Sequence, residues 1–272
     1  FTKASQILKR KFKMKIKDTV HYQWYKHVGT FAVLAICLYA CIRITNANLS
    51  EVLSNTKQMQ LFLQKLLHPD WSYLPSLITP IIKTIQMSIL STLLGVLLAI
   101  PFSFLATTLI TKNTVLTGCI RFVMNIIRTI PNTLLAAILV SIVGIGEVTG
   151  VITLTIFTFG LVSQLLYESI ETIDTLPVES AESVGANKFK VAVWAVWPQI
   201  LPAVISYTFY ALEINIRSST VLGYVGAGGI GIILNTSLAL FKYDRVSIII
   251  LMILILVILV DTISEYARRK CV

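Results

Sequence analysis

The chain has 272 residues, of which 56% are hydrophobic and 13% are charged, and its mean hydropathy is +0.80. Soluble domains carry about 25% charged residues, so this composition excludes an ordinary soluble globular domain. The formal net charge is +10. We interpret this excess as a signal of membrane topology and of attraction to lipid headgroups, and we expect no nucleic-acid partner.

Residues 1–27 form a basic segment ahead of the first apolar stretch. Leu8, Phe12 and Ile16 recur every four residues, which is typical of an amphipathic helix at a membrane interface. The alternation of apolar residues with lysines would also fit a strand, but an isolated edge strand beside a bilayer has no partner. We therefore predict an interfacial helix here, followed by a transmembrane domain at 28–272.

Six apolar stretches follow. A helix needs roughly 20 apolar residues to cross a bilayer, so each stretch is a candidate span. The second stretch is too long for one crossing. We expect Pro101 to kink or end its helix, because an internal proline removes a backbone hydrogen bond. The sequence thus predicts an all-α integral membrane protein with about six transmembrane helices. The stretches are Val28–Ile44, Leu77–Ile110, Phe122–Val143, Val148–Ser169, Ile200–Ile216 and Val246–Ser264.

Lysine and arginine mark the cytoplasmic side of a membrane protein, and both ends of this chain are basic. An even number of crossings places the two ends on one side, which the basic residues assign to the cytoplasm. The same count puts Lys112, Arg121 and the loop at about 171–198 on that side. We therefore expect a multi-pass protein of a cytoplasmic membrane, with its N and C termini in the cytoplasm.

Residues with catalytic or metal-binding chemistry are few. Cys37 and Cys41 lie four residues apart in the first apolar stretch, and no cysteine or histidine spacing suggests a disulfide framework or a metal site. The sequence also has no nucleophile–base pattern, no phosphate-binding glycine loop and no Walker lysine. We therefore predict no catalytic residue, no bound metal and no hydrolysis of nucleotide by this chain.

A short polar segment, Glu179–Gly185, interrupts the apolar pattern, and Pro198 follows it thirteen residues later. Pro177 suits the first turn of a helix that Asp174 or Thr175 could cap. The glycine at the end of the segment permits a left-handed cap. The small side chains between them leave a low profile that another protein could approach closely.

A second helix is expected at Ala186–Val196, and Pro198 is expected to mark the return to the membrane. The residues alone leave two interpretations equally open for this polar loop. It is either a docking site for a soluble partner or an ordinary helix–turn–helix connection between two spans.

Charges inside the apolar stretches cost about 2.5–3.5 kcal/mol each at the bilayer centre, so they are candidates for function. Glu213 and Arg217 are spaced i, i+4 and can pair on one helix face. Arg128 has no acidic residue within four positions, and Pro131 bends the helix beside it. Arg128 could face a water-filled pathway, where it would suit an oxyanion, or snorkel to headgroups near the cytoplasmic end of its span. We expect Asp261 at an interface or in a hydrogen bond between helices.

The run from Gly223 to Gly231 is too rich in glycine for an uninterrupted helix, because each interior glycine costs about 0.5–1 kcal/mol relative to alanine. Irregular backbone in a membrane protein must be covered by protein or line a water-filled cavity. We expect a re-entrant loop or tight packing at an external gate, or equally a helix-packing surface of small residues. The candidate route or gate residues are Arg128, Pro131, Arg217, Gly226, Gly228 and Gly229.

The pattern Glu179-x-Ala181-x-x-x-Gly185 is similar to the EAA loop of ABC-importer permeases, and the proline thirteen residues later agrees with that loop. Ser180 stands where alanine is commonest in the family, which replaces one small residue by another. The resemblance implies a type I, MetI-like permease fold and a loop that docks in a groove of a cytoplasmic ATPase. The implied coupling residues are Glu179, Ser180, Ala181, Gly185, Ala186 and Pro198.

Two further segments, Arg128–Asn132 and Leu212–Gly231, resemble the permeases of phosphonate transporters. The likeness extends from about Ile82 to Arg268, which is well over half of the chain. It implies a translocation subunit rather than an enzyme. Such a subunit would move phosphonate or a related phosphorus oxyanion into a bacterial cell by alternating access.

The same resemblance implies several partners. A cytoplasmic ABC ATPase dimer would bind the loop and use ATP and Mg, while this chain would bind no cofactor. A second permease subunit, identical or closely related, would complete the pathway in the lipid bilayer, and an external binding protein would deliver the cargo. The alternatives are an ABC permease for methionine, phosphate or phosphite, and an ion-coupled secondary transporter. The absence of an internal repeat between 28–143 and 148–264 disfavours the latter.

Overall fold

The computed structural model describes residues 24–45 and 55–271, and the regular secondary structure in these ranges is helical. The chain divides into two units, residues 1–61 and 62–272, which are described separately. In the first unit, α2 (Trp24–Ile44) is long and apolar enough to cross a membrane, and its described side chains are almost all exposed. An apolar surface of that size is normally covered by lipid or by another protein. The predicted interfacial helix lies almost wholly outside the described residues.

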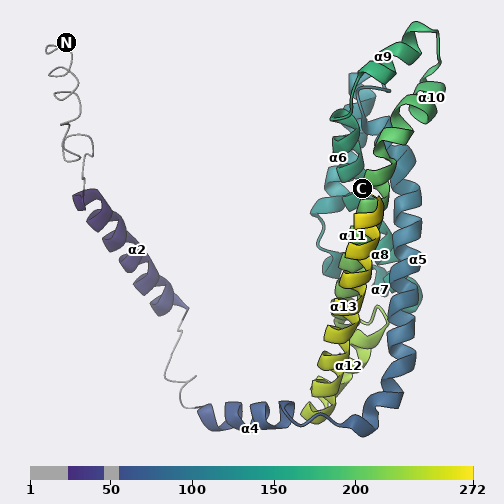
Figure 1. The fold of residues 1–272 in the computed structure, drawn as a ribbon. Coiled ribbons are helices and arrows are strands. Elements are labelled where there is room, and N and C mark those ends of the chain that lie inside the picture. Colours follow the sequence, from purple (N-terminus) through teal and green to yellow (C-terminus); the bar gives the residue numbers. More distant parts are fainter. Residues whose placement is uncertain (1–23, 46–54, 272) are drawn as a thin grey trace, which may run out of the picture. The chain divides into compact units, whose positions relative to one another are not determined.

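The second unit is a bundle of long helices in which α5, α8 and α11 pack most extensively on one another (Figure 1). Helices α9 and α10 lie at one end of the bundle and α12 lies toward the other, and we call these the α9 end and the α12 end. From α4 onward the elements are α4 (Thr56–Leu66), η2 (Trp71–Tyr73), α5 (Leu74–Ala106), α6 (Thr114–Thr129), α7 (Asn132–Val143), α8 (Glu147–Glu171), α9 (Leu176–Ser183), α10 (Lys188–Val191), η3 (Ala192–Val196), α11 (Trp197–Leu222), η4 (Gly223–Val225), α12 (Ile230–Ala239) and α13 (Tyr243–Cys271).

Five described helices are long and apolar enough to cross a membrane, and the pair α6–α7 makes a sixth if it counts as one span. This number agrees with the predicted fold class. The predicted span Phe122–Val143 is bent at Pro131, as expected, and the bend is large, because α6 and α7 meet at an angle of 87°. A proline disfavours helical geometry at the residue before it, and Ile130, which precedes Pro131, is extended with ψ of 120°.

Pro101 does not end the helix of the second span, which was one of its two predicted effects. Helix α5 continues to Ala106 with this proline inside it. Packing on α8 holds the turn that follows, since Phe102 and Phe159 meet edge to face with 5.2 Å between ring centroids and Ser103 is buried. These contacts offset the backbone hydrogen bond that the proline removes.

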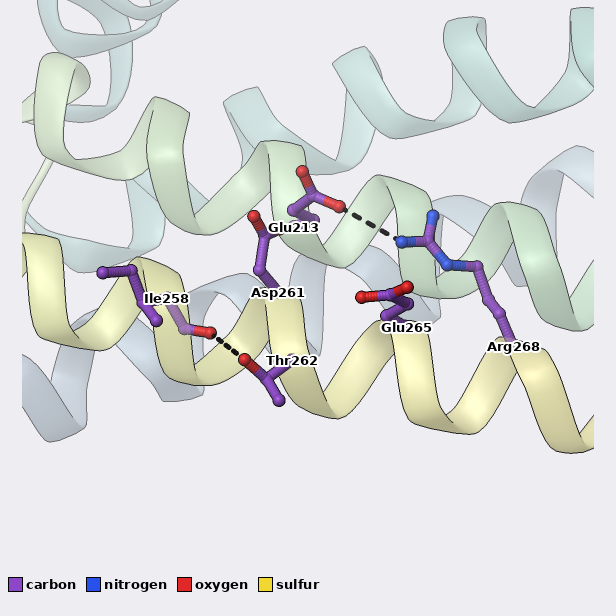
Figure 2. A pocket seen from close by; sticks show the side chains of 6 residues that line it. All are labelled: Glu213, Ile258, Asp261, Thr262, Glu265 and Arg268. Atoms are coloured by element: carbon purple, nitrogen blue, oxygen red, sulfur yellow. Dashed lines mark hydrogen bonds and ion pairs between the residues drawn. The ribbon is translucent and has the colours of Figure 1, made fainter.

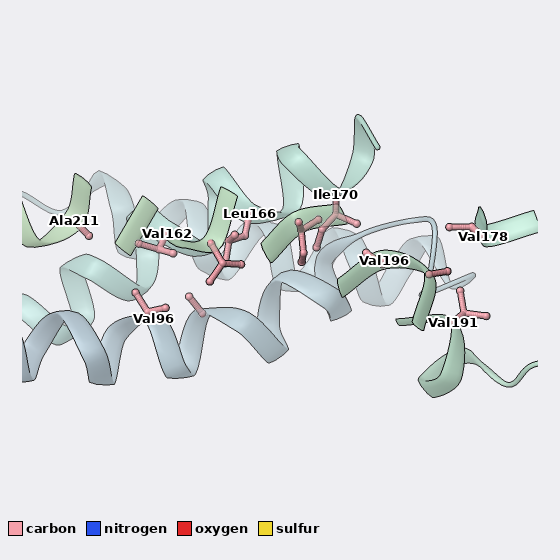
Figure 3. Close-up of a cluster of buried hydrophobic side chains, with 12 residues drawn as sticks. Val96, Val162, Leu166, Ile170, Val178, Val191, Val196 and Ala211 are labelled. Carbon is pink, nitrogen blue, oxygen red and sulfur yellow. The ribbon is translucent and has the colours of Figure 1, made fainter. Parts of the chain in front are cut away.

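One buried apolar cluster joins the α9 end to the long helices (Figure 3). Val178 of α9 and Val191 of α10 are buried in the same cluster as Ile170 of α8, Val96 of α5 and Val196 of η3. Fully burying a valine side chain contributes about 1.5–3 kcal/mol relative to leaving it exposed. The polar loop is therefore anchored on the bundle by apolar packing.

A buried polar junction connects the three central helices. Asn215 of α11 is fully buried, and its side-chain amide donates to Thr92 Oγ1 of α5 at 2.8 Å and to Thr158 Oγ1 of α8 at 2.7 Å. Gly95 of α5 lies directly against Thr158, where an added Cβ would stand 2.6 Å from the threonine Cβ. A small residue lets two membrane helices approach this closely. The junction therefore sets how α5, α8 and α11 pack.

Candidate functional site

The polar segment folds as helix α9, and its start is built by the predicted residues. Asp174 Oδ1 accepts a hydrogen bond from the Leu176 N–H at 3.0 Å, whereas Thr175 makes no side-chain cap bond. Pro177 lies in the first turn, where a missing N–H leaves no helical bond unmade. Of the two predicted capping residues, the structure thus selects Asp174.

Gly185 closes α9 in the left-handed conformation, with φ of +80°. Its N–H donates to Glu182 O at 2.9 Å, and the Ala186 N–H donates to Ala181 O at 3.1 Å. These two bonds satisfy carbonyls that the helix end would leave free. Among the described residues no heavy atom lies within 4 Å of the place where a Cβ would stand. Backbone conformation, rather than space, therefore selects glycine at this position.

The surface of the loop mixes small polar residues with protruding apolar ones. Glu179 and Ser180 are exposed and Ala181 is half-buried. Val184 and Phe189 are 85% and 75% exposed, so large apolar side chains stand out beside the small ones. Exposed apolar groups rimmed by polar residues are typical of a protein-binding surface. Sequence reasoning noticed only the small residues, because exposure depends on how the loop folds back.

The second predicted helix, Ala186–Val196, is present from Lys188 onward, but it is not one uniform α-helix. It consists of the short helix α10, capped by Asn187, and a π-turn, η3, that runs directly into α11. The Trp197 N–H donates to Ala192 O, five residues back, which defines the wide turn. Pro198 explains this geometry, because it has no N–H for the carbonyl four residues before it. Pro198 accordingly lies inside the first turn of a continuous helix rather than at a break.

Arg128 lies in the last turn of α6, directly before the α6–α7 break, and it is exposed. Its backbone lies next to Gly160, since a Cβ on that glycine would be 3.5 Å from Arg128 N. Gly160 is near the middle of α8. The expectation that Arg128 lies near one end of its span is therefore wrong, because the break at Pro131 ends α6 halfway along the bundle. No ion pair of Arg128 is present within residues 24–45 and 55–271.

Arg217 pairs with Glu213 one turn earlier on α11, at 2.7 Å, as the spacing predicts. It also lies 3.7 Å from Asp261 of α13, and Arg268 of α13 lies 3.6 Å from Glu213. Figure 2 shows Glu213 and Asp261 facing each other between the two helices, with Arg268 reaching back to the glutamate. Asp261 thus lies between two helices, as expected, but its contact with Arg217 is an ion pair rather than the predicted hydrogen bond. Four charged side chains neutralise one another along this seam.

A recess of about 250 Å³ opens beside this network, lined in part by Asn132, Arg217 and Ser218. The Asn132 side-chain amide donates to Ser218 Oγ at 3.2 Å and so joins the start of α7 to α11. The Arg217 side chain remains 56% exposed in spite of its two carboxylate partners. A guanidinium and a hydroxyl from α11 and an amide from the start of α7 therefore line one recess beside the Pro131 break. Sequence reasoning missed Asn132 and Ser218, because they lie 86 positions apart.

The glycine-rich run is irregular backbone covered by protein. Gly226, Gly228 and Gly229 all have positive φ, and the segment threads between the ends of α5 and α8. A Cβ on Gly228 would stand 2.9 Å from Glu147 Cα, and one on Gly229 would stand 2.7 Å from Thr84 Oγ1. Tight packing is therefore present at this end. Small residues also pack helix against helix here, since a Cβ on Gly231 of α12 would stand 2.2 Å from Thr220 O of α11.

Residues 91–271 match the family described as the binding-protein-dependent transport system inner membrane component. The chain belongs to this family, so it is the membrane-spanning permease subunit of an ABC importer and not its catalytic subunit. It is a multi-pass membrane protein.

Relatives and solved structures agree with this assignment. Over 247 residues the chain is 34% identical to the phosphite transport system permease protein PtxC of Stutzerimonas stutzeri, a match that covers 90% of each chain. It is 31% identical to the phosphate-import permease protein PhnE of Mycolicibacterium smegmatis, over 72% of this chain and 37% of that one. The fold resembles an inward-facing structure of the MetNI methionine ABC transporter, with a TM-score of 0.67, 21% identity and coverage of 75% of this chain and 99% of that chain. That structural similarity confirms the predicted MetI-like architecture.

Proposed function

We propose that this permease carries a phosphorus oxyanion, such as phosphonate or phosphite, into a bacterial cell. Two of its relatives bear the names of phosphite and phosphate systems, which supports that class of cargo. The observation on the chain itself that carries the proposal is the recess beside Arg217, where three different hydrogen-bond donors converge after the α6–α7 break.

The chemistry of the recess suits a tetrahedral oxyanion. A guanidinium donates to such an anion through two parallel N–H groups, and Asn132 and Ser218 add an amide and a hydroxyl. Asn132 is also the first residue of α7, a helix whose N-terminal N–H groups favour negative charge. Arg128, without an ion pair among the described residues, precedes the same break and would supply a second positive charge along the route.

The pairing of Arg217 with Glu213 fits weak rather than tight binding. An arriving oxyanion competes with a carboxylate that already occupies one side of the guanidinium at 2.7 Å. A transport pathway needs cargo to leave as readily as it enters. Glu213 therefore limits the residence time of the anion while it keeps the arginine oriented.

The α9 end is assigned to the cytoplasm in this proposal. Its exposed loop, with Glu179, Ser180, Ala181, Gly185 and Ala186, would dock on a cytoplasmic ATPase that supplies ATP and Mg, while the permease binds no cofactor. Closure of the ATPase dimer would displace the loop and shift the bundle between two comparably stable states. The glycine-rich run at the α12 end, including Gly226, would then face outward as part of the external gate.

The complete machine would contain two permease subunits, identical or closely related, two ATPase subunits and an external binding protein. The chain would lie in the bacterial cytoplasmic membrane with its basic N and C termini in the cytoplasm. Family membership counts against the ion-coupled alternative, because this family is defined by dependence on a binding protein. Methionine remains the cargo of the structural relative only, since similarity at 21% identity concerns the fold.

Reconstitution tests the proposal. The permease, its ATPase and its binding protein are placed in proteoliposomes, and uptake is measured for methylphosphonate, phosphite, phosphate and methionine with ATP on the ATPase side. Uptake of a phosphorus oxyanion that requires ATP is the expected result. Uptake of methionine alone, or uptake driven by an ion gradient without ATP, would overturn the assignment.

A further inference from the structure

Arg121 of α6 contacts the ends of two other helices at the α9 end. Its Nε donates to the carbonyl of Ala106, the last residue of α5, at 2.8 Å. Its terminal nitrogen pairs with the carboxylate of Glu171, the last residue of α8. The guanidinium also lies over the ring of Tyr167, 4.7 Å from its centroid. One side chain thus connects α5, α6 and α8 where all three approach the polar loop.

Each of these contacts stabilises a polar or charged group at the end of a helix. The last carbonyls of a helix lack helical partners, so Ala106 gains a donor from the arginine. Glu171 stands at the negative end of the α8 dipole, where a carboxylate is unfavourable without a nearby cation. The side chains of Arg121 and Glu171 are only 28% and 32% exposed, so water screens this ion pair less than a surface pair.

The same region connects directly to helix α9. Glu171 is followed by a four-residue connection, 172–175, and then by α9 itself. On its other side α9 meets the α5–α6 loop, where Lys112 Nζ lies 3.2 Å from Glu182. Lys112 and Glu182 are 66% and 42% exposed, so this second pair is weak in water. The Arg121–Glu171 pair, which joins α6 to the end of α8 that leads into α9, is therefore better shielded than the Lys112–Glu182 pair, which reaches α9 itself.

We propose that Arg121 is a positioning residue for energy coupling: it makes the ends of α5, α6 and α8 move as one body with α9. Apart from Arg121, a displacement of α9 reaches α5 through the buried apolar cluster and through the exposed Lys112–Glu182 pair. Arg121 adds direct polar bonds from α6 to the ends of α5 and α8, and α6 leads to Arg128 and the break beside the recess. This inference rests on the proposed docking role of α9. It adds that Arg121 transmits the displacement of α9 to the neighbouring helices α5 and α6.

The rest of the bundle does not need Arg121 for its packing. The junction of Asn215, Thr92 and Thr158 joins α5, α8 and α11 further along the bundle. The apolar cluster around Val178 and Ile170 anchors the loop separately. Removal of the arginine should therefore loosen the helix ends locally while the fold and the ATPase-binding surface persist.

The test compares Arg121→Gln with Arg121→Lys and with the control Arg269→Gln, in proteoliposomes that contain the ATPase and the binding protein. Arg269 pairs with Glu265 one turn earlier on α13, at an exposed position, so its replacement is a matched loss of a paired arginine. The measured quantities are transport, ATP hydrolysis, their ratio, and recovery of the assembled complex. We expect Arg121→Gln to lower transport per ATP by about tenfold, the scale of one charge-assisted contact, with hydrolysis and assembly retained.

Further variants distinguish a failure of the Arg121 role from a failure of the docking role of α9. Arg121→Lys keeps the charge but lacks the planar, rigid fork with which the guanidinium bonds Ala106 and Glu171, so an intermediate ratio is expected. The exchange Arg121→Glu with Glu171→Arg should restore part of the ratio. An unchanged ratio in Arg121→Gln, or equal loss of hydrolysis and transport together with lost assembly, would overturn the coupling role. If Gly185→Val also left coupling intact, the docking role of α9 itself would fail. A defect in Gly185→Val alone would overturn only the role of Arg121.

Discussion

Replacement of Gly185 by valine is the most direct perturbation of the polar loop. Gly185 has φ of +80°, and an L-residue in the left-handed region costs about 1–2 kcal/mol. A β-branched side chain lies at the upper end of that range or beyond it. Among the described residues nothing lies within 4 Å of the new Cβ, so no clash adds to this penalty.

Valine can escape the strain only by changing φ, and this breaks the end of α9. The bonds from the Gly185 N–H to Glu182 O and from the Ala186 N–H to Ala181 O would then be lost. The two bonds together contribute about 1–3 kcal/mol, at 0.5–1.5 kcal/mol each. Either way the native conformation of the loop is destabilised by about 1–2 kcal/mol. This lowers the ratio of native to non-native loop by a factor of about 5–30.

The expected result is weaker binding of the ATPase by that same factor, because a partner sees only the competent fraction of the loop. Binding is measured by titrating the ATPase onto the detergent-solubilised permease, and ATP-driven uptake is measured in parallel. Gly185→Asn is the matched control, since asparagine tolerates the left-handed region and should retain most of the affinity. Membrane insertion should not change. Wild-type affinity and uptake in Gly185→Val would refute the coupling assignment.

Three further predictions concern the bundle. Arg128→Gln should lower oxyanion uptake by about tenfold while the binding protein still stimulates ATP hydrolysis, and unchanged uptake would remove Arg128 from the route. Asn215→Ala should destabilise the protein by about 1–3 kcal/mol in thermal unfolding, whereas Asn235→Ala, at a long and partly exposed bond, should have little effect. Gly150→Ala should lower the unfolding temperature, because its Cβ would overlap the carbonyl of Ala227, at a cost of about 1–3 kcal/mol. An equal effect of the two asparagines, or no effect at Gly150, would contradict the packing described.

Features with a short-range cause were predictable from the sequence. The left-handed cap at Gly185 and the start of α9 depend on a few adjacent residues, and both are present. The Glu213–Arg217 pair follows from helical spacing alone. The effect of Pro131 was foreseen as a bend, but its size of 87°, which divides the predicted span into two helices, was not. A proline specifies where a helix is weak, and packing decides how far it turns.

Proline also shows the opposite outcome within the same chain. Pro101, which was expected to kink or end its helix, does not end α5, and Pro198, which was expected to mark the return to the membrane, lies in the first turn of α11. At Pro101 the contact of Phe102 with Phe159 holds the following turn, and at Pro198 a π-turn absorbs the missing hydrogen bond. The local rule is the same for all three prolines. The residues that pack on each proline in the folded protein differ, and the sequence alone does not show which residues these are.

The sequence by itself determined that this is a helical membrane protein with about six spans, and its motifs indicated the permease family. Apolar length and local capping depend on residues close together in the chain, so no tertiary information was needed. Only the tertiary structure decided that Arg121 bridges partners 15 and 50 positions away and that Asn132 meets Ser218 across 86 positions. Such contacts exist because three long helices pack closely around Gly95 and Asn215, and that packing is a property of the whole bundle.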